Sequence, residues 1–377
     1  MNFELTEEQQ MLQDTMRRFL SERYDTATRN AILDSAQGYS SEIWAQMAEL
    51  GIVGALFSED DGGFGGAGFD ISTVFEELGR AGVVEPLLDT AILGGGLIAR
   101  LGNDAQKEML VEVIAGELQL ALAHGEPESR YDLSRVTTRI ESQGGKMVLN
   151  GRKAVVVNAD AASHLVVSAR ESGEDDDESG ISLFLLPADA PGVSMRGYPL
   201  FSGGRAAEIT LDGVEVDDAT RLGAAGEAFD ALASQIAAAE VALAAETLGA
   251  METAAALTRD YLMTRKQFGR PIGSFQALQH RMADMMIELE QARSAVILAA
   301  GHLEDAAPER DRHISAARNL LGRAGRLVAE DSIQMHGGIA MTQEYELAHI
   351  AKRIVMADHR FGDTDTQLER FIALSAA

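Results

Sequence analysis

The sequence predicts an α+β protein, mostly α, with an N-terminal helical domain, a middle β-barrel or sandwich domain and a C-terminal four-helix bundle. Three observations lead to this fold class. The 377 residues are enough for two or three domains. Alanine and leucine dominate and only 5% of residues are aromatic, which favours helix. The hydrophobic pattern changes from helical spacing to alternation near Gly116 and back near Ala224, so we expect domains at 1–118, 119–223 and 224–377.

The N-terminal domain is expected to be helical. Thr6 followed by Gln9 predicts a capping box at the start of the first helix, and Trp44 is expected to anchor the core. The glycine-rich segment 60–66 precedes a helix, but its acidic pair argues against phosphate binding. We expect flexibility or tight backbone packing there instead. Further helices are expected at 41–50, 71–81, 85–101 and 105–115.

The middle domain is expected to contain short strands. Gly144-Gly145, Asn150-Gly151 and Asp212-Gly213 are typical of hairpin turns. The acidic segment 171–180 is interpreted as a flexible hairpin tip and not as a metal site. The expected strands are 118–124, 135–141, 146–149, 153–157, 164–169, 182–187, 193–196 and 206–214.

The C-terminal domain is expected to be a bundle of long helices at 228–266, 277–302, 311–336, 345–356 and 366–375. The first two helices are joined by a segment that contains Arg265, Arg270 and two phenylalanines, punctuated by Gly269 and Gly273. Its residues alone leave two interpretations open: a solvated surface turn, or a corner where an arginine meets a phosphate.

Composition excludes several classes of function. The net charge of -27 provides no basic stripe for nucleic acid. The absence of cysteine excludes disulfides and thiolate metal sites, and we predict no metal site. We also predict no membrane-spanning run, and the polar N-terminal segment argues against a signal peptide. The expected location is therefore cytoplasmic.

Two long motifs resemble the acyl-CoA dehydrogenase family. The first is 265–280, which begins RKQFG and continues as IGSFQALQH from Ile272, and the second is 334–342 (QMHGGIAMT). With the helix–β–helix order, the resemblance covers nearly the whole chain and implies the acyl-CoA dehydrogenase fold. Within the family, 123–133 (AHGEPESRYDL), 196–199 (RGYP) and 361–365 (FGDTD) are most similar to the small subunits of pimeloyl-CoA dehydrogenases.

The resemblance implies FAD as the cofactor, with the flavin between the β domain and the bundle and the adenosine half covered by a neighbouring subunit. It implies at least a dimer, usually a dimer of dimers, as a homotetramer or heterotetramer. Electrons would pass to an electron-transfer flavoprotein or a similar acceptor, in fatty acid or dicarboxylate degradation. The residues expected to contact a neighbour's FAD are Arg265, Gln267, Phe268, Gln334, Gly337 and Gly338. Further cofactor contacts are expected from His124, Gly125, Val157, Asp365 and Gln367.

The implied reaction is α,β-dehydrogenation of an acyl-CoA thioester. A carboxylate removes the α proton while a hydride moves from the β carbon to flavin N5, and hydrogen bonds to the thioester carbonyl acidify the α carbon. Such a base should lie in a dry, apolar pocket that raises its pKa towards the working pH.

The catalytic base is where the sequence departs from the family. The usual glutamate position holds Asp363, whose side chain is one methylene shorter. The alternative position on the long helix holds Ala239, and its neighbour Glu240 would point about 100° around that helix. Glu246, two turns further on, is expected in the bundle or on the surface. Three possibilities stay open: Asp363 as the base, Glu240 as the base, or no base in this subunit.

The flavin-side strands depart as well. Gly125 stands where relatives carry a threonine that bonds the flavin, and the aromatic lid is replaced by Val155-Val156-Val157. Backbone N–H groups could still bond the ring edge, and the side chain of His124 could face the flavin or be a satisfied polar group. Arg130 and Tyr131 are expected beside the CoA arm, where Arg130 could also reach a distal carboxylate. Glu240 is a further candidate for substrate contact.

Three functional hypotheses follow. The first is a flavin-dependent acyl-CoA dehydrogenase subunit that acts on a medium, bulky or dicarboxylyl acyl-CoA. The second is a partner subunit without turnover, which completes the FAD site of a second, catalytic dehydrogenase subunit. The third is a nitroalkane-oxidase-like flavoenzyme with Asp363 as its base.

Overall fold

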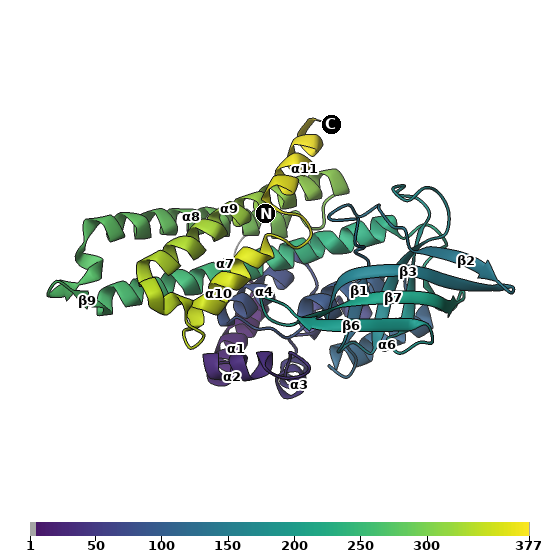
Figure 1. The fold of residues 1–377 in the computed structure, drawn as a ribbon, viewed down its shortest axis with the longest axis horizontal. Coiled ribbons are helices and arrows are strands. Elements are labelled where there is room, and N and C mark those ends of the chain that lie inside the picture. The colour runs from purple at the N-terminus through teal and green to yellow at the C-terminus, as the bar shows by residue number, and fades with distance from the viewer. Residues whose placement is uncertain (1–4, 377) are drawn as a thin grey trace.

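The computed structural model describes residues 5–376, which form three parts (Figure 1). A long helical bundle extends across the molecule, the β domain lies at one end of it, and the first helices pack along its side. The elements follow the helix–β–helix order, which confirms the predicted fold class.

The N-terminal part opens on the predicted capping box, because the Thr6 hydroxyl accepts from the backbone N–H of Gln9 and the Gln9 side chain accepts from the N–H of Thr6. Trp44 is buried and its indole N–H donates to the Gly116 carbonyl at 2.8 Å. The helices are α1 (Glu7–Arg23), α2 (Thr26–Leu33), α3 (Ser41–Glu49), α4 (Gly68–Ala81), α5 (Gly96–Leu101) and α6 (Asp104–Ile114).

The glycine-rich segment 60–66 packs tightly against neighbouring backbone, which was one of the two expectations for it. A Cβ at Gly63 would lie 2.3 Å from the Phe57 carbonyl oxygen, and one at Gly65 would lie 2.3 Å from that of Ala55. The short 3-10 turn η1 (Gly54–Leu56) precedes the segment, and η2 (Glu59–Asp61) overlaps its start. The single helix expected at 85–101 instead divides into a π-helix, η3 (Leu88–Gly95), followed by α5.

The β domain contains one sheet with the path β6-β7-β3-β2-β4-β5-β8, and β1 pairs with β4 in parallel. The predicted Gly144-Gly145 turn joins β2 to β3, where Gln143 pairs with Lys146. The strands are β1 (Leu120–Ala123), β2 (Arg139–Gln143), β3 (Lys146–Val157), β4 (His164–Arg170), β5 (Ile181–Pro187), β6 (Val193–Pro199), β7 (Arg205–Val216) and β8 (Arg221–Leu222).

Two predicted turns are wrong. Asn150-Gly151 and Asp212-Gly213 lie inside the long strands β3 and β7, where the register shifts between Leu149 and Gly151. The two dipeptides face each other, and the Asn150 side-chain oxygen accepts from the N–H of Gly213 at 2.8 Å. Asp212 and Gly213 of β7 lie opposite the single residue Asn150 of β3, which makes a bulge, because a glycine in a strand permits an irregular pairing as readily as a reversal.

The acidic segment 171–180 joins the antiparallel strands β4 and β5, so the predicted hairpin tip is confirmed. It wraps around Arg170, whose side chain is buried and donates to the carbonyl oxygens of Ser179 at 2.8 Å and Asp175 at 3.1 Å. The Asp175 carboxylate in turn pairs with Arg139 at 2.6 Å. A buried guanidinium fixes the loop because its donors need acceptors.

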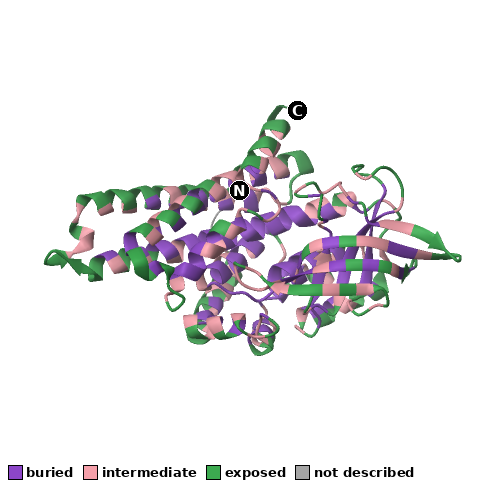
Figure 2. Ribbon diagram, in the orientation of Figure 1, coloured by how far each residue is buried: buried purple, intermediate pink, exposed green. Residues whose placement is uncertain are grey.

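The C-terminal bundle is organised around α7, which is buried along most of its central length (Figure 2). By length and composition α7 could cross a membrane, contrary to the prediction that no run reaches that length. Its most apolar window is 83% buried inside the protein, so it is the core helix of the bundle. The helices are α7 (Phe229–Thr264), α8 (Gln276–Gly301), α9 (Ala307–His336), α10 (Glu346–Ala357) and α11 (Thr364–Ala376), with the short hairpin β9 (Lys266–Gln267) and β10 (Arg270–Pro271) and the 3-10 turns η4 (Ile272–Ser274) and η5 (Gly337–Met341).

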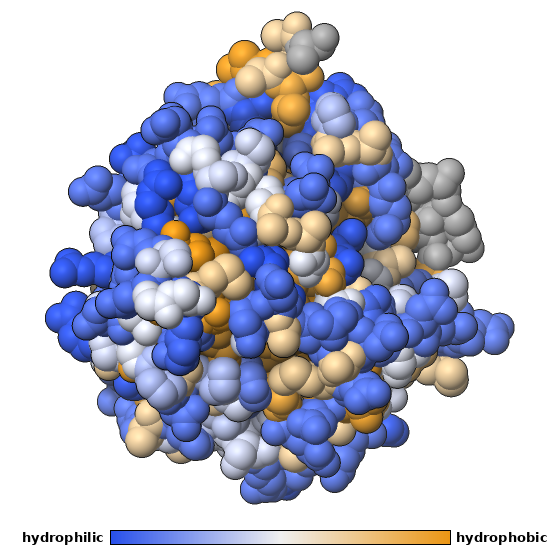
Figure 3. All heavy atoms as spheres, turned by 90° about the vertical axis from the view of Figure 1, so that its right-hand side faces the viewer, coloured by the Kyte–Doolittle hydropathy of each residue, from blue (hydrophilic) through white to orange (hydrophobic). Residues whose placement is uncertain are grey.

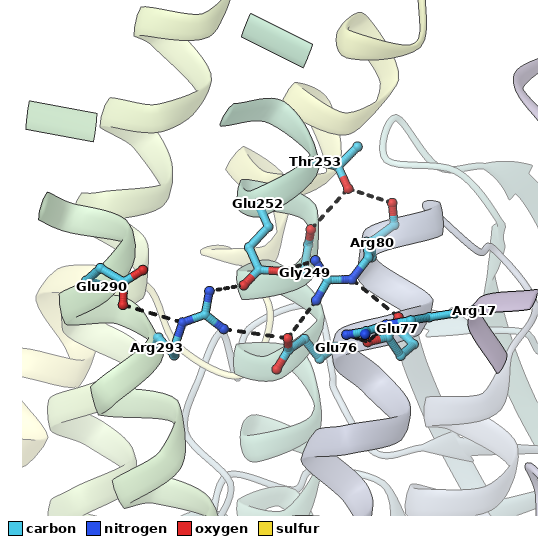
Figure 4. A network of polar contacts seen from close by, with 9 residues as sticks. All are labelled: Arg17, Glu76, Glu77, Arg80, Gly249, Glu252, Thr253, Glu290 and Arg293. Atoms are coloured by element: carbon cyan, nitrogen blue, oxygen red, sulfur yellow. Dashed lines mark hydrogen bonds and ion pairs between the residues drawn. The ribbon is translucent and has the colours of Figure 1, made fainter. Parts of the chain in front are cut away.

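Helix α4 packs directly on α7, because a Cβ at Gly79 would lie 1.9 Å from the Glu246 carbonyl oxygen. A network of ion pairs surrounds this contact (Figure 4). Arg80 of α4 lies between Glu76, at 2.7 Å, and Glu252 of α7. Arg293 of α8 also pairs with Glu252, and Arg17 of α1 pairs with Glu77, so the network joins four helices. It fixes the N-terminal helices to the bundle and thereby shapes the cavities between them.

Candidate functional site

The segment that follows β1 presents unpaired backbone groups. Among residues 5–376, the backbone N–H groups of His124 and Gly125 have no acceptor. A Cβ at Gly125 would meet only the Ala154 carbonyl oxygen within 4 Å, at 3.5 Å, so the space beside it is open. Two free donors beside open space can bind the polar edge of a flat ring.

A buried ion pair supports this segment from inside the β domain. Lys153 and Glu126 lie 2.7 Å apart, with side chains that are 0% and 3% exposed. The Lys153 ammonium also donates to the His124 carbonyl oxygen at 3.2 Å. Burial lowers the pKa of Lys153 to about 8 despite the facing carboxylate. Burial would raise the pKa of Glu126, but Lys153 and hydrogen bonds from Thr137 and Thr138 outweigh it and lower that pKa to about 2.

The side chain of His124 faces the interior of the β domain, so it does not face a flavin or a substrate as was considered from the sequence. Its Nδ1 lies 2.9 Å from the Ser168 hydroxyl. Burial, followed by the charge of Lys153, lowers the pKa of His124 to about 3, so the ring is neutral. His124 therefore fits the other interpretation, a polar residue at a strand end whose side chain has a hydrogen-bond partner. Only its backbone remains available for a cofactor.

The strand end where valines replace the aromatic lid has an unusual conformation. Val155 has a φ of 52° and is exposed, and Asn158 has a φ of 64°. Val157 lines a cavity, while the Asn158 amide donates to the Leu120 carbonyl oxygen at 3.3 Å. A valine in the left-handed region is strained, and such strain is typical of a functional position.

Two cavities lie one after the other along α7. The outer cavity, of about 330 Å³, touches Ile236 and Gln367; the inner cavity, of about 130 Å³, touches Leu243 and Arg360. The α7 residues of both cavities are spaced three or four apart, which puts them on one face of the helix. Glu240 occupies that face between them. These α7 residues are Phe229, Ala233 and Ile236 in the outer cavity, and Leu243 and Glu246 in the inner one.

The inner cavity is lined by charged groups. Arg353 donates to Glu246 at 2.5 Å, and Arg360 pairs with Asp89. Glu85 is also buried, and its Oε2 has no partner among the described residues. Burial raises the pKa of Glu85 and of Asp89. Glu246 is therefore a buried cavity residue, so the part of the expectation that placed it on the surface is wrong.

Asp363 lies at the rim of the outer cavity, between Phe361 and Thr366, and caps α11. Its Oδ1 accepts from the backbone N–H of Thr366 at 2.9 Å and from the Thr366 hydroxyl at 2.7 Å. Its Oδ2 accepts from Arg130 at 3.2 Å. The bonds from Thr366, followed by Arg130, lower the pKa of Asp363, and its side chain is 20% exposed. The dry, pKa-raising pocket expected around this carboxylate is absent from its surroundings.

Glu240 has the environment that was expected of the base. It is completely buried, and burial raises the pKa of its carboxyl group. Its two oxygens accept from Gln367 at 2.6 Å and Arg370 at 3.3 Å, so it ties α7 to α11. Gln367 is thus a buried partner of Glu240, whereas Asp365 is exposed on α11. Tyr131 lines the outer cavity, and the Arg130 guanidinium lies 5.3 Å from the centre of its ring.

The remaining predicted cofactor residues meet at the far tip of the bundle. Tyr261 of α7 stacks on His336 of α9 with ring centres 4.4 Å apart, which brings the ends of these helices together. Arg265 and Gln267 follow Tyr261; Phe268, which is 91% exposed, comes next. Gln334, Gly337 and Gly338 flank His336 and are exposed. Figure 1 places β9 at this tip, opposite the β domain, so one chain does not bring these residues to its own Gly125.

The charged lining of the inner cavity was missed from the sequence. One signal was present, because Asp89 interrupts the apolar run 87–93 and a buried carboxylate needs a partner. The partner, Arg360, is 271 residues away along the chain. No spacing rule connects the two.

Comparisons with known proteins indicate one family along nearly the whole chain. Models described as acyl-CoA dehydrogenase N-terminal, middle and C-terminal domains match residues 6–117, 121–214 and 227–373. Benzylmalonyl-CoA dehydrogenase of Aromatoleum aromaticum is 31% identical over 80% of each chain. The solved structure of a steroid ACAD variant, Tcur3481-Tcur3483, is 30% identical over 98% of each chain with a TM-score of 0.87. An FAD complex of PigA shares the fold, with 24% identity, a TM-score of 0.91 and coverage of 100% and 99%.

Proposed function

Because this chain belongs to the acyl-CoA dehydrogenase family, we propose that it is a subunit of an FAD-dependent enzyme that removes the α and β hydrogens of an acyl-CoA thioester. The observation that carries the proposal is the pair of cavities along α7. The outer one opens beside Arg130 and Tyr131 and suits a CoA arm. The inner one suits the acyl group, and Val157 of the flavin-side strand β3 lines it.

The residues present fit FAD at two separate places. The open space and free N–H groups at His124 and Gly125 suit the flavin edge, and no atom lies within 4 Å of a Cβ placed on Gly337 or Gly338. When bound, FAD supplies the acceptor for the hydride. The guanidinium of Arg265 provides a planar set of donors for a diphosphate. Because the two places lie at opposite ends of the chain, we propose that the tip serves a neighbouring subunit's FAD.

We propose Asp363 as the base, because it lies at the cavity rim while Glu240 is enclosed by Gln367 and Arg370. In the free protein its pKa is lowered, which weakens it as a base. A bound thioester that covers this carboxylate would remove water and raise the pKa, since desolvation disfavours the charged form. Glu240 then acts as a positioning residue that holds α11, and with it Asp363, against α7.

The charges of the inner cavity favour an acyl group that carries polar substituents, such as the second carboxylate of a dicarboxylyl thioester. The guanidinium groups of Arg353 and Arg360, which line this cavity, are the donors that such a carboxylate needs. We further propose an electron-transfer flavoprotein or similar acceptor, and a dimer of dimers. Exposed apolar side chains on α8 and α11, including Ile287 and Ile372, suit subunit contacts. Figure 3 shows hydrophobic residues gathered at the top of the molecule, where α11 ends.

The experiment is flavin reduction in the purified chain. Absorbance gives the flavin content per protomer, and addition of acyl-CoA thioesters under anaerobic conditions should bleach the flavin band. Asp363→Asn retains a good helix cap but no base, so it should slow bleaching by about 10²- to 10⁴-fold with little change in stability. Glu369→Gln, an exposed change on the same helix, is the control. Bleaching at the wild-type rate in Asp363→Asn would disprove the assignment of the base.

A partner subunit without turnover is the second candidate, and two observations favour it. Asp363 is engaged as a helix cap, and ion pairs line the inner cavity. This hypothesis predicts a colourless protein that becomes yellow only with a second dehydrogenase subunit. In that complex, Arg265→Ala should reduce flavin content while Asp363→Asn changes nothing. Bleaching by nitroethane and by no acyl-CoA would instead support a nitroalkane-oxidase-like activity.

A further inference from the structure

The junction of α8 and α9 gathers metal-ligating side chains outside the cavities described above. His302, Glu309 and His313 each offer a ligand atom, and these atoms all lie within 4.8 Å of one another. The two imidazole rings stack with centres 3.7 Å apart and planes 6° apart. The Glu309 carboxylate lies 3.0 Å from Nε2 of His313. None of these three residues lines a cavity near α11 or takes part in the proposed reaction.

Local structure fixes the three residues. His302 caps the C-terminus of α8, and the Asp305 N–H donates to its carbonyl oxygen at 3.1 Å, which closes the turn. Glu309 and His313 stand four residues apart at the start of α9, on one face of the helix. Buried Ala300 of α8 and Ile314 of α9 belong to one small apolar cluster, which holds the two helices together.

We propose that His302, Glu309 and His313 bind a divalent transition metal ion such as Zn²⁺. Two imidazole nitrogens and one carboxylate oxygen form a ligand set that suits Zn²⁺ or Co²⁺ better than Mg²⁺ or Ca²⁺, which prefer oxygen. Water would fill the fourth position, because both histidine side chains reach solvent, with 20% and 25% exposure.

Asp305 provides the supporting contact that metal-binding histidines need. Its carboxylate lies 2.7 Å from Nδ1 of His302. A proton held on Nδ1 leaves Nε2 as the lone-pair donor and fixes the orientation of the ring. The stacked rings must splay apart on binding, so that both lone pairs point at the ion.

One neighbour competes with the ion. Arg312 donates to the same Glu309 oxygen that faces His313, at 2.6 Å. Metal binding must displace the guanidinium from that oxygen. Removal of Arg312 should therefore strengthen metal binding. If Glu309 does not bind the ion, removal of Arg312 should leave the metal affinity unchanged.

The test is titration of the untagged full chain with Co²⁺, followed by the visible spectrum of the bound ion and by equilibrium dialysis. One ion per chain should bind, and Zn²⁺ should displace it. His302→Ala and His313→Ala should each weaken binding at least about tenfold, as should Asp305→Asn, since outer partners matter almost as much as ligands. Arg312→Ala should bind more tightly. His280→Ala, which removes an exposed histidine of α8, should bind like the wild type.

The outcomes separate clearly. Absence of bound Co²⁺, or binding that persists in both His302→Ala and His313→Ala, would overturn the proposal. Equal displacement of Co²⁺ by Mg²⁺ would also overturn it, because it would indicate nonspecific carboxylate binding on this acidic protein. Far-UV circular dichroism verifies that each variant is folded, and His302→Gln replaces His302→Ala if the alanine variant is not.

Discussion

Replacement of Lys153 by methionine tests the buried ion pair that supports the end of β1. Methionine fills much of the same space but donates no hydrogen bond. The change removes the ammonium 2.7 Å from Glu126, along with its bonds to the Ser168 hydroxyl and the His124 carbonyl. Removal of one member of a buried pair costs about 3–5 kcal/mol. Glu126 keeps its bonds from the N–H groups of Thr137 and Thr138, so we expect the lower end, about 3 kcal/mol.

Lys146 of the same strand provides a matched control. It pairs with Glu215 at the same distance, 2.7 Å, but these side chains are 63% and 64% exposed. An exposed pair contributes at most about 1 kcal/mol, so Lys146→Met should change stability little. The comparison isolates burial, because the ion-pair distance, the strand and the substitution are the same.

Hydrogen exchange of β3 and β7, measured by mass spectrometry, is the appropriate assay, because the single tryptophan, Trp44, reports on a different part of the chain. Lys153→Met should lower the free energy of opening of these strands, and Lys146→Met should not. Addition of Glu126→Gln to Lys153→Met should recover part of the loss, since it removes the unpaired charge. Equal effects of the two lysine variants would refute the reasoning.

Three further predictions concern pH, packing and the cofactor. His124 has a pKa of about 3 in the folded protein against 6.5 for a free histidine, so unfolding takes up a proton between these values. Stability should therefore fall as pH drops below 6.5, by up to about 1.4 kcal/mol per pH unit from this residue, and the Tm of His124→Gln should fall less steeply. Gly79→Ala should lower the free energy of unfolding by about 2–3 kcal/mol, and Tm with it, because α4 must move away from α7. Gly338→Ala should leave Tm unchanged, because nothing lies within 4 Å of its added Cβ. Arg265→Ala should reduce flavin content in the assembled enzyme without changing the Tm of the isolated chain, because its side chain is exposed; an unchanged flavin content would contradict the proposed role of the tip.

Local features of the fold were predictable from sequence because their causes are local. The capping box of Thr6 and Gln9 depends on residues three apart, and the long bundle helices depend on periodicity within one segment. Turn prediction succeeded at Gly144-Gly145 and failed at Asn150-Gly151. The reason for the different outcomes lies outside the dipeptides themselves. At Gly151 the strand β7 lies opposite and continues the pairing across the bulge, so the chain does not reverse there.

The candidate site divides in the same way. The sequence by itself determined which residues carry the family's motifs. Those motifs were enough to predict the fold and the turn around Arg265. Only the tertiary structure decided the environments of the candidate bases. Asp363 has a lowered pKa because Thr366 and Arg130 bond to it, and Glu240 has a raised one because α11 buries it. A pKa depends on desolvation and on charges within a few ångströms, and packing brings those groups from distant parts of the chain.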